Sequence, residues 1–74
     1  MVKVKLFGVI RLQAGVSGFE TEARSIDEVR SEIPGVTKRE AKDLVVMVNG
    51  KSVSRWYRLK DGDEVVFLSP AGGG

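Results

Sequence analysis

The chain has 74 residues, with 12 basic and 10 acidic side chains, a net charge of +2, and neither histidine nor cysteine. This is the length of one small domain, which must be stabilised by packing because no disulfide can form. Without an imidazole or a thiol, the chain has no nucleophile–base pair of the hydrolase type and no His/Cys metal site. We therefore predict that the protein is not an enzyme and holds no metal.

Basic and acidic residues are interspersed along the chain, which favours a mixed polar surface over a nucleic-acid footprint. No apolar run is long enough for a membrane helix, and the first residues lack the order of a signal peptide. We expect a cytoplasmic protein that binds neither nucleic acid nor membranes.

The first third of the chain has the pattern of a β-hairpin. Residues 2–7 alternate between apolar and polar, which predicts a strand that points Val4 and Leu6 inward and Phe7 outward. Residues 9–12 either continue this strand or begin another. Residues 19–23 alternate again and are predicted to form the return strand.

Two helix starts follow. Ser25, with Glu28 three residues later, fits a capping box and predicts a helix that ends at Pro34-Gly35. Thr37 begins a second capping box, but the stretch up to Leu44 allows only one or two turns.

Three strands are predicted in the last part of the chain. The apolar run 44–48 is typical of a strand buried on both faces, or nearly so. Asn49-Gly50 predicts a tight hairpin turn, after which residues 51–53 return. Residues 60–63 form another turn, and residues 64–68 the last strand, with Val65 and Phe67 inward.

Strand, strand, helix, strand, short strand and strand is the order of an α+β fold. One main helix must cover one face of a mixed sheet of four to five strands. The first and last strands can lie together at its centre, which is the β-grasp, or ubiquitin-like, roll. We expect this domain to span residues 1–69 and residues 70–74 to form a flexible glycine tail.

A series of short motifs in the second half of the chain resembles one family. The series is Val48-Asn49-Gly50, then Leu59, then 61–65 (Asp-Gly-Asp-Glu-Val), then an apolar pair, Pro70 and terminal glycines. In this order they resemble the β-grasp sulfur carriers, and the likeness covers nearly the whole chain. That family includes the small subunit of molybdopterin synthase, the sulfur carrier of thiamin synthesis and the archaeal small modifiers.

The resemblance implies a function for the C-terminus. An enzyme similar to ubiquitin-activating enzymes would use ATP and magnesium to adenylate the carboxylate of Gly74, with Gly73 as its required neighbour. The product would be a thiocarboxylate, for example for the large subunit of molybdopterin synthase, or a bond to lysines of target proteins. The carrier itself would bind no cofactor. Ser69 departs from the molybdopterin branch, whose members tend to have proline there.

A partner surface is predicted beside the tail. Phe7 and Leu68 point outward on strands that would be neighbours, and Val66 can join them. An exposed apolar cluster of this kind indicates an interaction surface. We assign the partner interface to Phe7, Val66, Leu68 and Pro70.

Other interpretations stay open at this point. The chain could be a β-grasp interaction module with an idle tail, or less readily a nucleic-acid binder. Within the carrier class, the sequence does not choose between sulfur transfer and protein conjugation. We interpret Asp61, Asp63 and Glu64 as a solvated turn and not as a metal site. Residues 55–58, which hold a tryptophan and a tyrosine, are interpreted as packing and not as a base-stacking surface.

Overall fold

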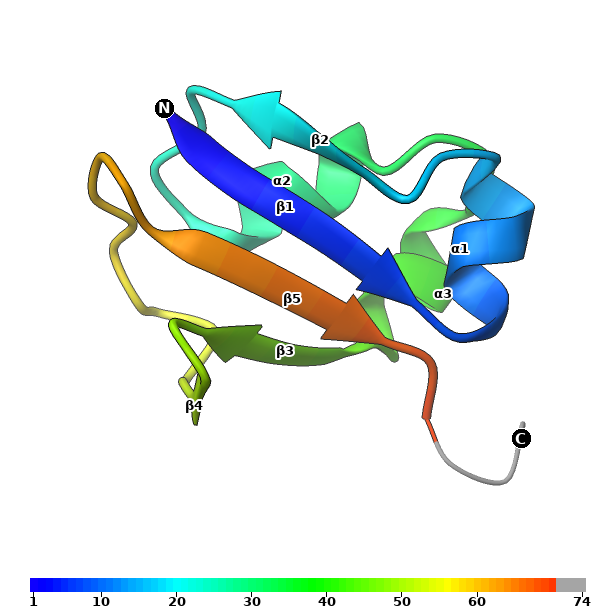
Figure 1. Cartoon of the computed structure of the whole chain (residues 1–74). Coiled ribbons are helices and arrows are strands. Elements are labelled where there is room, and N and C mark those ends of the chain that lie inside the picture. The colour runs from blue at the N-terminus through cyan, green and yellow to red at the C-terminus, as the bar shows by residue number, and fades with distance from the viewer. Residues whose placement is uncertain (71–74) are drawn as a thin grey trace.

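The computed structural model describes residues 1–70, in which three short helices accompany one mixed sheet of five strands (Figure 1). The strands lie in the order β2-β1-β5-β3-β4, with β1 and β5 parallel at the centre and the other pairs antiparallel. The elements are β1 (Val2–Phe7), α1 (Val9–Ala14), β2 (Gly18–Thr21), α2 (Ile26–Glu32), α3 (Lys38–Lys42), β3 (Val45–Val48), β4 (Lys51–Ser52) and β5 (Glu64–Leu68). The predicted α+β, β-grasp architecture is confirmed.

The core lies between the sheet and α2. Side chains of β1 alternate between buried and exposed, as the period of two predicts, and Val65 and Phe67 of β5 are fully buried. Ile26 and Val29 of α2 pack on these strands. Only one face of the sheet is therefore covered, and its other face, here called the open face, has no element over it in Figure 1.

The segment after β1 is a helix and not a strand. We predicted that residues 9–12 would continue β1 or begin a second strand, but they lie in α1. Gly8 has φ 79°, a conformation that ends the strand and turns the chain away from it. Ile10 of this short helix is buried in the core. The four residues 9–12 were too few to distinguish the period of 2 of a strand from the period of 3.6 of a helix.

The two predicted helix starts are correct. The Thr37 hydroxyl accepts from the Glu40 N–H, and the Glu40 side chain accepts from the Thr37 N–H, which completes the capping box of α3. At α2 the Ser25 hydroxyl accepts from the Glu28 N–H at 3.2 Å. The same hydroxyl donates to the Glu28 carboxylate at 3.1 Å, so α2 has the cap without the reciprocal backbone bond.

Strand β3 is buried on one face only, which corrects the expectation for the run 44–48. Val46 and Val48 face the core, whereas Val45 is 45% exposed on the open face. The reason is that all three helices leave that face uncovered. The β3–β4 turn is as predicted, with positive φ at both Asn49 (51°) and Gly50 (81°), the signature of a tight hairpin turn.

The turn before β5 is partly buried, contrary to its interpretation as solvated. Asp63 is 6% exposed and accepts hydrogen bonds from the Asn49 side-chain amide (3.0 Å) and the Lys60 N–H (2.9 Å). The Asn49 side-chain oxygen in turn accepts from the Glu64 N–H at 3.0 Å. Asp61, by contrast, is exposed as expected and pairs with the Met1 amine and Arg24.

The prediction for residues 55–58 is correct for Tyr57 and wrong for Trp56. Tyr57 packs against the core, but Trp56 is 75% exposed. Trp56 lies in the loop before β5, where the guanidinium of Arg55 stacks on its ring at 4.9 Å.

Within the part of the chain that the structure describes, no helix is long and apolar enough to cross a membrane.

Candidate functional site

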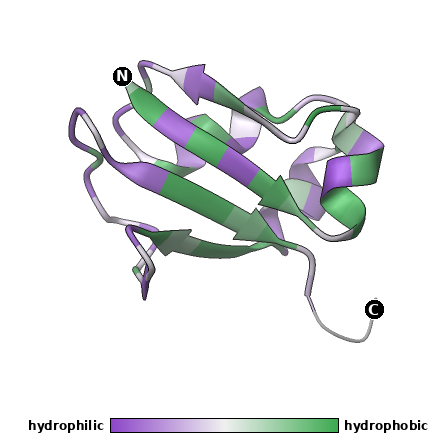
Figure 2. Cartoon of the chain, viewed as in Figure 1, coloured by the Kyte–Doolittle hydropathy of each residue, from purple (hydrophilic) through white to green (hydrophobic). Residues whose placement is uncertain are grey.

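The open face of the sheet carries a continuous apolar patch over three strands. Strand register places Phe7 beside Leu68 and Leu68 beside Val45 in one row. The next row places Val66 beside Met47. We call these five residues, Phe7, Val45, Met47, Val66 and Leu68, the apolar patch. Figure 2 shows the same area as hydrophobic colour along β5 and β3 and at the end of β1.

The side chains of the patch are available to a partner. Phe7 is 43% exposed and Val45 is 45% exposed, while Met47, Val66 and Leu68 are partly exposed. They come from neighbouring strands, whose backbone pairing fixes their order across the sheet. Contiguous exposed apolar side chains of this kind mark interaction sites more often than scattered single ones do.

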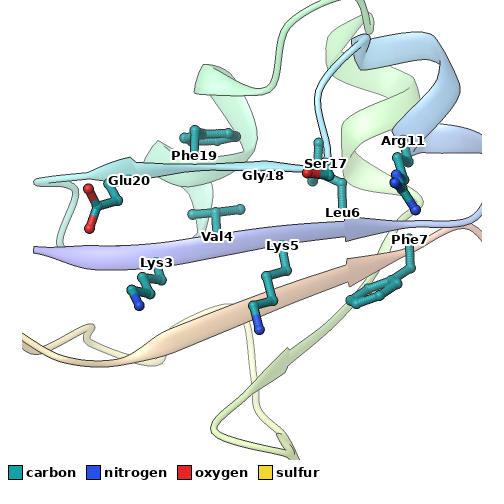
Figure 3. Close-up of a pocket in the computed structure, with 10 residues that line it drawn as sticks. All are labelled: Lys3, Val4, Lys5, Leu6, Phe7, Arg11, Ser17, Gly18, Phe19 and Glu20. Carbon is teal, nitrogen blue, oxygen red and sulfur yellow. The ribbon is translucent and has the colours of Figure 1, made fainter.

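Positive charge borders the patch on the side of β1. Figure 3 shows Lys3, Lys5 and Phe7 on one side of β1, and Val4 and Leu6 on the other. Arg11 of α1 completes a shallow groove of about 380 Å³ along this edge. Lys5 pairs with Glu64 at 3.2 Å, whereas Lys3 and Arg11 form no ion pair within residues 1–70. Glu20 of β2 lies opposite Lys3 and lines the same groove, so this border of the patch carries both signs of charge, with the basic side chains in excess.

The C-terminal segment leaves the body at the end of β5, next to the patch. Ser69 and Pro70 follow Leu68 directly and border a second groove, of about 450 Å³, between α1 and Leu44. Pro70 is exposed at this groove and is not part of the two rows of the patch. Gly73 and Gly74, the residues predicted to carry the reaction, lie outside the described residues.

The structure brings three of the predicted interface residues together and adds two. Phe7, Val66 and Leu68 lie side by side as the alternation predicted. Val45 and Met47 were missed because the run 44–48 suggested burial on both faces. The missing signal was available in the predicted fold, since one helix layer covers only one face and every second residue of that run must then be exposed.

Two carboxylates with lowered pKa values, Asp61 and Asp63, lie at the opposite end of β5 from Leu68. Backbone and amide donors lower the pKa of Asp63, with the Lys60 N–H as the largest cause and the Asn49 side chain second. The Met1 amine lowers the pKa of Asp61 through a hydrogen bond, and Arg24 adds to it. Both carboxylates belong to the turn before β5, and no group of three or more potential metal ligands occurs in residues 1–70.

Comparisons with known proteins agree with this geometry. Residues 4–74 match the model of the ThiS family. A Pyrococcus furiosus protein described as a candidate molybdopterin converting factor subunit 1 is 32% identical, with a TM-score of 0.70 over 95% of this chain and 97% of its own. Subunit 1 of the molybdopterin-converting factor of Helicobacter pylori, solved in a complex with subunit 2, is 25% identical, with a TM-score of 0.69 over 99% and 97%.

A more distant structure shares the fold. The SAMP1 protein of Haloferax volcanii is 18% identical, with a TM-score of 0.74 over 99% of this chain and 98% of its own. A comparison with curated protein sequences gives no match.

Proposed function

This chain belongs to the ThiS family of β-grasp sulfur carriers, which are substrates of activating enzymes and not enzymes themselves, and we propose that its own reactive group is the carboxylate of Gly74. In this proposal an adenylating enzyme activates the carboxylate, which is then converted to a thiocarboxylate or joined to lysines of target proteins. The observation that carries the proposal is the apolar patch, which ends where β5 passes into the C-terminal segment.

The chemistry requires activation because a carboxylate is a poor electrophile. One carboxylate oxygen attacks the α-phosphorus of ATP, forming an acyl-adenylate and releasing pyrophosphate. A sulfur or amine nucleophile then attacks the acyl carbon, and AMP leaves. ATP and magnesium are held by the partner enzyme, so this chain contributes only the carboxylate and a surface by which it is recognised.

The apolar patch supplies binding energy that the glycines cannot. Ordering each residue of the segment 70–74 costs roughly 1–2 kcal/mol, so threading all five costs about 5–10 kcal/mol. Burying an apolar side chain contributes about 1.5–3 kcal/mol when it was fully exposed, and less for the partly exposed side chains of the patch. The five side chains of the patch together are therefore of the size needed to offset the cost of ordering the segment.

Two pathways are candidates for the activated C-terminus: sulfur transfer and conjugation to lysines. Sulfur transfer is supported by the similarity to molybdopterin-converting factor subunits, one of which was solved in a complex with its subunit 2. The corresponding partner here would be a large subunit of that kind. Conjugation to lysines requires the same acyl-adenylate and the same patch. The ATP-dependent step is consistent with a cytoplasmic location.

Deletion of Gly73 and Gly74 tests the proposal directly. We expect the shortened protein to unfold at the same urea concentration as the full chain, because the hydrophobic core is formed by residues between Val2 and Phe67. It should support no ATP–pyrophosphate exchange by a cognate activating enzyme. Exchange that survives the deletion would show that Gly74 is not the reactive residue, and absence of exchange with the full chain would leave the alternative, an interaction module with an idle tail. The mass of the protein recovered from its own cells then distinguishes sulfur for oxygen at the terminus from a Gly74–lysine bond.

A pair of charge substitutions tests the patch. Val45→Glu places a carboxylate within the patch, whereas Leu12→Glu changes a residue of α1 that is 81% exposed and lies outside it. Both positions are exposed, so both variants should remain folded. We expect Val45→Glu to raise the KM for the carrier in pyrophosphate exchange by at least about tenfold, from loss of apolar contact and burial of an unpaired charge. The opposite ranking of the two variants would place the docking surface on α1.

A further inference from the structure

Ser69 connects the end of β5 to the start of α1. Its hydroxyl oxygen accepts a hydrogen bond from the Ile10 N–H at 2.8 Å, in a partly buried position and 59 residues away along the chain. Gly8, at the N-cap of α1, has no side chain that could cap the helix. Ser69 therefore supplies from the other end of the chain the acceptor that the first turn of a helix normally takes from its own N-cap residue.

Two neighbouring residues hold Ser69 in this place. The following residue, Pro70, disfavours the helical conformation at Ser69. Gly8 is the second of these residues. A side-chain Cβ at position 8 would come within a tight 3.3 Å of both Cβ and Oγ of Ser69. Gly8 also has φ 79°, which residues with a side chain rarely adopt. The absence of a side chain at position 8 therefore makes room for Ser69.

We propose that Ser69 is a positioning residue for the activation of Gly74: its bond to Ile10 fixes the point and direction from which the C-terminal segment leaves the body. This inference rests on the proposed function. The carboxylate proposed to react, that of Gly74, is five residues beyond Ser69, which is at most about 17–18 Å of extended chain. With so short a reach, a fixed origin beside the apolar patch limits how far from a docked partner's contact surface the carboxylate can be placed.

Loss of the bond should act on recognition and not on chemistry. Without the hydroxyl, residue 69 must be ordered when the partner binds instead of being ordered beforehand. Because binding then includes this cost, the affinity for the partner falls. The net contribution of a single neutral hydrogen bond corresponds to a change of roughly two- to tenfold in a binding constant. We therefore expect the KM for the carrier to rise by that factor in Ser69→Ala, while kcat for pyrophosphate exchange stays unchanged.

The experiment compares Ser69→Ala with two controls on the full-length chain. Ser69→Thr keeps a hydroxyl at the same place and should restore the wild-type KM. Ser31→Ala removes a hydroxyl that bonds the Glu28 carbonyl within α2, and should leave the KM unchanged. Pyrophosphate exchange with the cognate activating enzyme gives KM and kcat, and hydrogen exchange at the Ile10 amide reports directly on the bond. That amide should exchange faster in Ser69→Ala and at the wild-type rate in the other two variants.

The outcomes separate this inference from the function on which it rests. If the wild-type protein supports no pyrophosphate exchange, the proposed function fails and the inference falls with it. If wild type is active and Ser69→Ala has an unchanged or lower KM despite faster exchange at Ile10, Ser69 merely caps α1 and the inference alone is overturned. A rise in KM that Ser69→Thr does not reverse would also overturn it.

Discussion

Two aspartates in the turn before β5 are predicted to differ sharply in their contribution to stability. Asp63 is buried, and its carboxylate accepts from the Asn49 side chain and the Lys60 N–H. Asp61 lies two residues earlier and is exposed, with partners only at the surface. Substitution of each by alanine therefore compares a buried carboxylate with an exposed one in the same turn.

The cost of Asp63→Ala follows from its two hydrogen bonds. A hydrogen bond to a charged group contributes about 1.5–3 kcal/mol, and part of this is recovered because water can reach the exposed residues Asn49 and Lys60. We expect a loss of about 2–4 kcal/mol in the free energy of unfolding. A domain of this length has a total of only about 4–11 kcal/mol, so the variant should retain roughly half of its stability. Asp61→Ala should change the free energy far less, because exposed ion pairs contribute little.

Urea denaturation followed by far-ultraviolet circular dichroism measures both variants at pH 7. The slope m should stay the same in all three proteins, so that a shift of the midpoint reports a change in stability. An equal shift for the two variants, or a loss below about 0.5 kcal/mol for Asp63→Ala, would refute the reasoning, since losses of that size are typical of surface changes. The double variant with Asn49→Ala should lose less than the sum of the single losses, because both residues share one bond.

Three further predictions follow from individual contacts. The pKa of Asp63 is lowered in the folded protein, chiefly by the hydrogen bond from the Lys60 N–H. Its carboxylate therefore stabilises the fold fully above the unfolded pKa of about 3.9, and this stabilisation is lost as the pH falls through the lower native pKa. In Asp63→Asn the free energy of unfolding in urea should fall less steeply below about pH 4, and the same pH dependence as in the wild type would contradict this. Arg30 donates to the carbonyls of Ala41 and Leu44 and so joins α2 to the end of α3; Arg30→Lys should cost about 1–2 kcal/mol in urea unfolding, and a neutral result would show that charge alone suffices there. Thr37→Ala should cost about 1 kcal/mol and Thr37→Ser much less, measured in the same way; equal losses in both variants would show that the hydroxyl cap is not the cause.

The sequence by itself determined the elements that depend on near neighbours in the chain. The alternation in residues 2–7 and 64–68 predicted which side chains of β1 and β5 are buried, because successive side chains of a strand point to opposite faces. Ser25, Thr37 and Asn49-Gly50 predicted two helix starts and one turn, because caps and tight turns involve bonds that span only two to four residues. These signals, taken in order, were sufficient for the fold class and for three members of the apolar patch, but not for α1, which was predicted as a strand.

Only the tertiary structure decided the features that depend on distant partners. Val45 is exposed and Met47 partly exposed because no helix covers their face, and the apolar run 44–48 indicates this only once it is placed in a sheet with one helix layer. Asp63 is buried because Asn49, 14 residues earlier, lies beside it in the folded sheet. The bond from Ile10 to Ser69 closes a loop of 59 residues, and it forms because β1 and β5 run parallel and end at the same edge of the sheet. Local periodicity carries no information on such contacts, since they arise only when the central strands pair.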